Sequence, residues 1–140
     1  MKHIPSCFLA TAAVFALTGM LWGIQMSASH DHTLSPAHGH LNLIGFVAMS
    51  IFGFYYALTP TAARSRLAVL HFGLSVATVL VLTPGIALAI TQRGETLAQA
   101  GSSLAVLSMA LFAFVVLRHG VGTLSERPAL DPGVRNQPAE

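Results

Sequence analysis

Four long apolar stretches dominate this chain of 140 residues, and none of them contains an aspartate, glutamate, lysine or arginine. They run over residues 8–26, 37–58, 67–90 and 97–117. Each is close to the roughly 20 residues that an α-helix needs to cross the hydrocarbon core of a bilayer. The pattern therefore predicts an all-α protein, a bundle of four transmembrane helices.

The composition supports a membrane protein. Hydrophobic residues make up 54% of the chain, charged residues 9%, and the mean hydropathy is +0.67. A single soluble core of this size cannot bury so much apolar surface. We expect one membrane domain over residues 1–126, followed by a polar cytoplasmic tail over 127–140 that is disordered.

Basic residues are divided unequally between the two ends of the predicted bundle. Short loops rich in lysine and arginine stay in the cytoplasm. If all four helices cross, only Arg93 lies opposite the other basic residues. Those residues are Lys2, Arg64, Arg66, Arg118, Arg127 and Arg135. We therefore expect a multi-pass protein of a bacterial-type inner membrane, with both termini cytoplasmic and the loop over 26–36 periplasmic.

Two other interpretations of the charge and of the N-terminus are less favoured. The basic residues never cluster, so nucleic acid is not an expected partner.

The segment that ends near Ser27-Ala28-Ser29 resembles a cleavable secretory signal. Its apolar run is longer than the usual signal of about 7 to 15 residues, and cleavage would leave three spans. We interpret this run as the first span.

Four histidines lie within eleven residues around the start of the second span. Ser35 and Pro36 are typical of a helix N-cap and first residue, which puts His38 in the first turn and His40 in the second. Ionisable side chains in a membrane span usually bind or move something. Two positions apart on a helix, the two imidazoles point about 200° apart. They are therefore poorly placed to hold one ion together, but each can serve a different iron.

The histidine-rich segment allows three functions. In the first, a haem iron binds one nitrogen of a helix histidine and a backbone carbonyl or carboxylate binds the other. In the second, a copper or zinc ion is collected at the outer face, because imidazole suits both metals, while the local absence of cysteine argues against a structural tetrathiolate zinc site. The third is a structural or assembly subunit whose histidines only satisfy helix contacts. In the second function, the ligands of the copper or zinc ion would be His30, His32, His38 and His40.

Two further positions mark the third span. His71 lies about one turn into it, near the opposite membrane face from His38 and His40. We expect His71 to form a hydrogen bond within the bundle, with contact to a quinone or a second cofactor as the alternative. Pro84 should lie level with the two helix histidines.

Aromatic residues are concentrated near the inner end of the second span. Tryptophan, tyrosine and related side chains are common at the membrane interface. We therefore interpret these residues mainly as interface anchors. They are Phe52, Phe54, Tyr55 and Tyr56.

The second span resembles the haem-ligating helix of subunit I of the haem-copper oxidases. The resemblance rests on Ala37-His38-Gly39-His40, on the Leu41-Asn42-Leu43-Ile44-Gly45-Phe46 that follows, and on Phe52-Gly53-Phe54-Tyr55-Tyr56 with Pro60. It is specific over 23–60, roughly a quarter of the chain. In that family an Ala-His-x-His helix ligates two haems, one histidine to each. The resemblance implies that His38 and His40 bind low-spin haem b. The chain would then serve electron transfer or act as a gas-binding or redox accessory.

The chain departs from the family pattern in its oxygen chemistry. The family's oxygen-reducing centre uses further histidines around a copper ion, including an adjacent His-His pair and a histidine cross-linked to a tyrosine. This sequence has no His-His pair, and Tyr55 and Tyr56 lie at the other end of the helix. We expect an oxidoreductase at most, without oxygen reduction by this chain alone.

The length of the chain favours a symmetric assembly. The family's subunit resembles three four-helix arcs with pseudo-threefold symmetry, and this chain is about one arc. A homotrimer would let His38 of one protomer and His40 of its neighbour meet one haem at each interface. The expected partners are membrane lipid, further copies of the chain, and a quinone or a cytochrome as electron donor.

Overall fold

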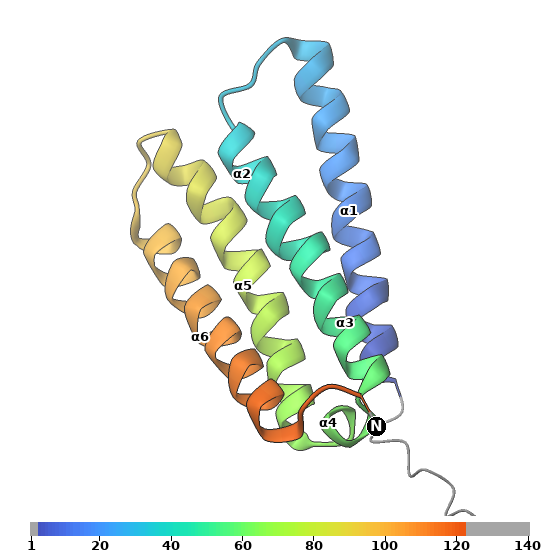
Figure 1. Ribbon diagram of the computed structural model, residues 1–140. Coiled ribbons are helices and arrows are strands. Elements are labelled where there is room, and N and C mark those ends of the chain that lie inside the picture. The colour runs from blue at the N-terminus through green and yellow to red at the C-terminus, as the bar shows by residue number, and fades with distance from the viewer. Residues whose placement is uncertain (1–2, 123–140) are drawn as a thin grey trace, which may run out of the picture.

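The computed structural model describes residues 3–122, and these residues form an all-helical structure with four long apolar helices (Figure 1). The four helices are long and apolar enough to cross a membrane, in agreement with the predicted multi-pass architecture. The predicted tail over 127–140 lies outside the described residues. The elements are α1 (Ile4–Ser29), α2 (Ser35–His40), the π-helix η1 (Leu41–Ala48), α3 (Met49–Leu58), α4 (Pro60–Ala63), α5 (Arg66–Ile90) and α6 (Thr96–His119).

The second span is one continuous helical rod made of α2, η1 and α3. It begins at Ser35, with Leu34 as the N-cap and no side-chain hydrogen bond at the cap. The prediction of Ser35 as the N-cap was therefore wrong by one residue, because Ser35 already has helical backbone geometry and Pro36 follows it within the first turn. His38 and His40 nevertheless lie in the first two turns, as the sequence predicts.

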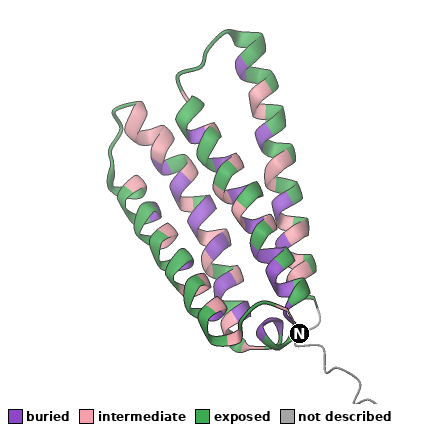
Figure 2. Ribbon diagram, viewed as in Figure 1, coloured by how far each residue is buried: buried purple, intermediate pink, exposed green. Residues whose placement is uncertain are grey.

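The helices lie side by side in chain order (Figure 1). Helix α1 packs against η1 and α3, the second span contacts α5, and α5 packs along α6, whereas α1 and α6 have almost no contact. In the most apolar 18 residues of each span, 39% of the residues are buried in the second span and 28% in α5. The share falls to 17% in α1 and in α6. Figure 2 shows the resulting exposed surface along α6. The second span and α5 are thus the inner helices, and α1 and α6 are the edges of an open arc.

A core of aromatic rings fills the arc near its Arg64 and Arg66 end. Phe52, Tyr55 and Tyr56 are buried, and only Phe54 of that group is exposed. The interpretation of all four as interface anchors was therefore wrong for three of them. Hydropathy cannot tell an aromatic ring that faces lipid from one that packs between helices, because both environments are apolar. The rings in contact with the Tyr56 side chain are those of Phe8, Tyr55 and His71.

Glycines allow α5 and α6 to approach closely. A Cβ atom added to Gly101 would lie 2.5 Å from the Leu82 Cα, and one added to Gly85 would lie 2.5 Å from the Ala98 nitrogen. Backbone atoms cannot move aside as a flexible side chain can. Small residues at such crossings let membrane helices gain close packing, which is the main attraction available to them in lipid.

We expect the Gly101→Ala substitution to lower the free energy of unfolding by about 1–3 kcal/mol, because the new methyl group forces α5 and α6 apart. Gly73→Ala is the matched control, since nothing lies within 4 Å of a Cβ at that helical position. Denaturant unfolding in mild detergent, followed by far-UV circular dichroism, measures both variants. Equal stability of the two variants would contradict the close crossing.

Candidate functional site

The histidine-rich end of the bundle holds four imidazoles within one loop and the first two turns of the second span. We call this the histidine end. The structure places His38 and His40 on different sides of α2, as their spacing predicts, and gives their ring nitrogens different partners. The loop residues His30 and His32 are exposed.

His38 is directed toward α1. Its Nε2 lies 3.1 Å from the backbone oxygen of Gly19. A carbonyl can only accept a hydrogen bond, so Nε2–H is the donor and the proton is on Nε2. The Trp22 ring packs edge-on against the imidazole, with centroids 5.9 Å apart. His38 is thus half-buried and joins the second span to the first.

His40 lies on the exposed side of α2. Its Nδ1 lies 2.8 Å from the backbone oxygen of Pro36, one turn earlier, and therefore donates to it. In the neutral ring this leaves the Nε2 lone pair free on the surface of the bundle. Ligating histidines in metal and haem sites show the same arrangement, with one ring N–H on a backbone carbonyl and the other nitrogen on the metal. A Cβ added to the neighbouring Gly39 would meet nothing within 4 Å, so the helix surface beside His40 is open.

The π-helix η1 starts directly after His40 and covers eight residues, Leu41–Ala48. Such segments are rare and are often found at functional sites. The Asn42 side chain donates to the His38 backbone oxygen at 3.0 Å, at the start of the wider turns. Asn42 also fills the space beside Gly19, where a Cβ would overlap its amide. The π-helix η1 was not predicted from the sequence, because a lone asparagine in an apolar run is only a weak signal for such a segment.

Local backbone interactions shape the loop that carries His30 and His32. His30 ends α1 in a left-handed conformation with φ of 55°. Hydrogen bonds from the side chain and backbone N–H of Thr33 lower the pKa of the Asp31 carboxyl, and the backbone bond is 2.9 Å long. Within residues 3–122 no three His, Cys, Asp or Glu side chains come together in a geometry that could hold a metal ion. The structure thus does not bring His30, His32, His38 and His40 together within one chain.

His71 forms a hydrogen bond within the bundle, as the sequence analysis expected. Its Nδ1 pairs with the Tyr56 hydroxyl at 3.1 Å, and both side chains are fully buried. The imidazole stacks on Phe112, with centroids 5.6 Å apart, and packs against Phe52 at 4.6 Å. Its Nε2 is buried without a hydrogen-bond partner among the described residues. The close packing of these rings leaves no space for a porphyrin beside His71.

A double-mutant cycle tests this buried pair. Tyr56→Phe and His71→Leu should each lower the free energy of unfolding by about 1–3 kcal/mol, because each leaves a buried polar group unpaired. The double variant should lose less than the sum, since the first substitution already removes the bond. Chemical denaturation of the four proteins in detergent gives the coupling energy, and strictly additive losses would rule out an energetically relevant pair.

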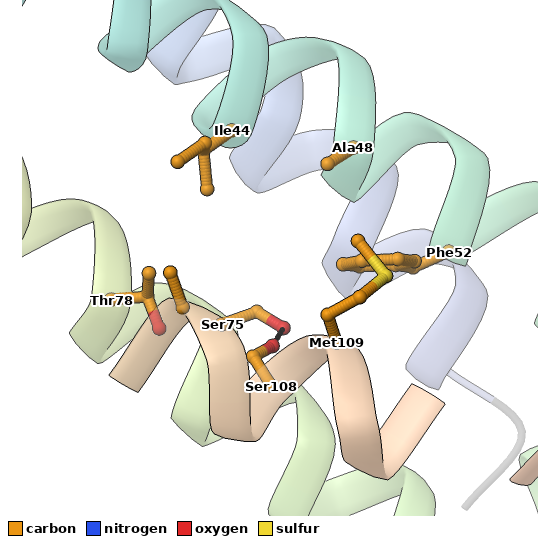
Figure 3. Close-up of a pocket in the computed structure, with 8 residues that line it drawn as sticks. Ile44, Ala48, Phe52, Ser75, Thr78, Ser108 and Met109 are labelled. Carbon is orange, nitrogen blue, oxygen red and sulfur yellow. Dashed lines mark hydrogen bonds between the residues drawn. The ribbon is translucent and has the colours of Figure 1, made fainter. Parts of the chain in front are cut away.

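A small cavity of about 80 Å³, lined by the Phe52 ring, lies between the second span, α5 and α6 (Figure 3). Its polar edge is the pair Ser75 and Ser108, whose hydroxyls are 2.9 Å apart. Ser75 donates its proton to the His71 backbone oxygen at 2.8 Å, so Ser108 is the donor within the pair. Both serine hydroxyls are satisfied, and so is that of Thr78, which also lines the cavity and donates to the Leu74 carbonyl. This cavity is too small for a tetrapyrrole.

Comparison of the chain with protein families, with curated proteins and with solved structures finds no match. The resemblance of residues 23–60 to the haem-copper oxidases therefore rests on the sequence of the second span.

Proposed function

We propose that this chain is an integral membrane b-type haem protein of the haem-copper oxidase subunit I type. His40 would provide one imidazole to the haem iron, and His38 is the candidate for the second. Haem supplies a one-electron redox centre or a site for a small gas, and the chain serves electron transfer or acts as a gas-binding or redox accessory. Because most basic residues lie at the other end of the bundle, we assign the histidine end to the periplasmic side and both termini to the cytoplasm.

The observation that carries the proposal is the hydrogen bond from His40 Nδ1 to the Pro36 carbonyl, 2.8 Å long. It orients the ring and leaves Nε2 free on a helix surface where Gly39 adds no side chain. The donor set fits haem better than a copper or zinc ion, because haem iron needs only one or two protein ligands. A bare metal site needs three or four.

In the neutral ring the hydrogen bond of His38 leaves its Nδ1, and not its Nε2, with a free lone pair. Its Nε2 proton is engaged with the Gly19 carbonyl, so coordination through Nε2 requires that bond to be released. This cost is on the order of 1 kcal/mol, that of a typical intramolecular hydrogen bond. The two histidines therefore differ in the nitrogen that keeps a free lone pair, which is Nε2 in His40 and Nδ1 in His38.

The arc of helices supports a homotrimer as the complete form. Helices α1 and α6 leave large apolar side chains exposed at both edges, including Leu21 on α1 and Val106 on α6. Since His38 and His40 lie on different sides of α2, a haem between two copies would meet His40 of one and His38 of the next. Cyclic symmetry repeats this contact three times with one kind of interface.

Optical spectroscopy of the purified protein tests the proposal. Haem bound by two imidazoles should give a Soret band and sharp α and β bands after reduction. His40→Ala should abolish haem binding, whereas His38→Ala should keep haem and convert it to a high-spin form that binds carbon monoxide. His3→Ala is the control for general loss of imidazole, since His3 is exposed at the opposite end of α1.

Retention of the full low-spin spectrum by a folded His40→Ala protein would contradict the assignment. Circular dichroism of each variant distinguishes a lost ligand from a lost fold. Sedimentation of the same haem-loaded samples should show a trimer, and a monomer with two-imidazole haem would exclude ligation between copies.

A further inference from the structure

A groove of about 410 Å³ opens on the surface of the bundle between α1 and α5, in the half nearer the histidine end. The second span lies between these two helices (Figure 1), and its buried Leu41 closes the groove on that side. Phe15 and Trp22 of α1 line one wall, and Thr83 and Pro84 of α5 line the other. The volume lies within the range of about 300–1,000 Å³ typical of small-molecule pockets.

The α5 wall of the groove offers polar groups without helical partners. Pro84 has no amide hydrogen, so the carbonyl of Leu80, which also lines the groove, cannot receive the usual hydrogen bond from residue 84. The Thr83 hydroxyl forms no hydrogen bond among residues 3–122. By contrast, the hydroxyls of Thr18 and Thr78 each donate to a backbone carbonyl one turn earlier, at 2.9 and 2.8 Å.

The α1 wall adds an unpaired donor. The indole N–H of Trp22 forms no hydrogen bond within the described part of the chain, and the ring lines the groove while its edge contacts His38. Polar groups at membrane depth are costly when they are not paired. The groove therefore combines an apolar wall and aromatic rings with one unpaired N–H donor, one carbonyl acceptor and two hydroxyls, of which that of Thr18 is paired and that of Thr83 is not.

We propose that this groove binds the ring of a membrane-soluble quinone or quinol. Quinone oxygens accept hydrogen bonds from the Trp22 N–H and the Thr83 hydroxyl, and a quinol hydroxyl donates to the Leu80 carbonyl. An acyl chain has no groups for these partners, and a neighbouring apolar helix satisfies its own backbone. No charged residue lines the groove, so a charged lipid headgroup has no counterpart in it.

Trp22 is the single tryptophan of the chain, so its fluorescence reports on the groove without a label. The haem-free full chain in lipid nanodiscs is titrated with decylubiquinone, a short-tailed quinone that quenches indole fluorescence on contact. We expect saturable quenching. Thr83→Val should raise the half-saturating concentration about tenfold, the effect of one lost hydrogen bond of about 1.4 kcal/mol. Thr83→Ser, which keeps the hydroxyl, should behave like the natural chain.

The matched control moves the single indole to a lipid-facing position. Phe54 on the second span is 58% exposed, so the double variant Trp22→Phe/Phe54→Trp places the tryptophan outside the groove. Its quenching should rise with quinone concentration without saturation. Unsaturated quenching of the natural chain with the same slope would overturn the proposal, as would equal saturation of the Thr83→Val variant.

A competing occupant is tested in the same format. Phospholipids with brominated acyl chains quench an indole that touches lipid tails. If brominated lipid still lowers the remaining Trp22 fluorescence at the highest decylubiquinone concentration by the same fraction as without quinone, lipid fills the groove and the proposal is wrong. Because haem-free protein is used, loss of quinone binding and loss of haem binding are separate results.

Discussion

The close approach of α1 to the second span is the constraint on which the histidine end depends. Gly19 and Gly45 carry no side chain at the points where Asn42 and Phe15 cross from the opposite helix. This approach brings the Gly19 carbonyl to 3.1 Å from His38 Nε2 and thereby fixes the rotation of the second span about its axis. With His38 held against α1, His40 must lie on the other side of the helix, where it is exposed.

One short helix therefore gives two neighbouring imidazoles different chemistry. His38 uses its Nε2 proton to join two spans, whereas His40 uses its Nδ1 proton to bind the Pro36 carbonyl and keeps Nε2 free. The wider turns of η1 begin at the next residue, with the Asn42 amide on the His38 carbonyl. At the opposite end, the buried pair of Tyr56 and His71 anchors the core far from this site.

Hydropathy and spacing predicted the four spans, the opposite directions of the helix histidines and the hydrogen bond of His71 within the bundle. Pro84 also lies at the expected level, because it lines the same groove as Trp22 and Leu41. The sequence could not predict the π-helix or the burial of Tyr55 and Tyr56, since both depend on contacts between spans. For the same reason the sequence could not distinguish His38 from His40. The backbone of α1 makes them different, because it binds the imidazole of His38 and not that of His40.

Nitrogen NMR of protein labelled with ¹⁵N in its seven histidines tests the central claim most directly. The His40 signals are assigned by their loss in His40→Gln. In the haem-free protein, His40 should carry its proton on Nδ1, and its unprotonated Nε2 signal should disappear when ferric haem is added. A proton on His40 Nε2, or a His40 signal that haem leaves unchanged, would contradict the account.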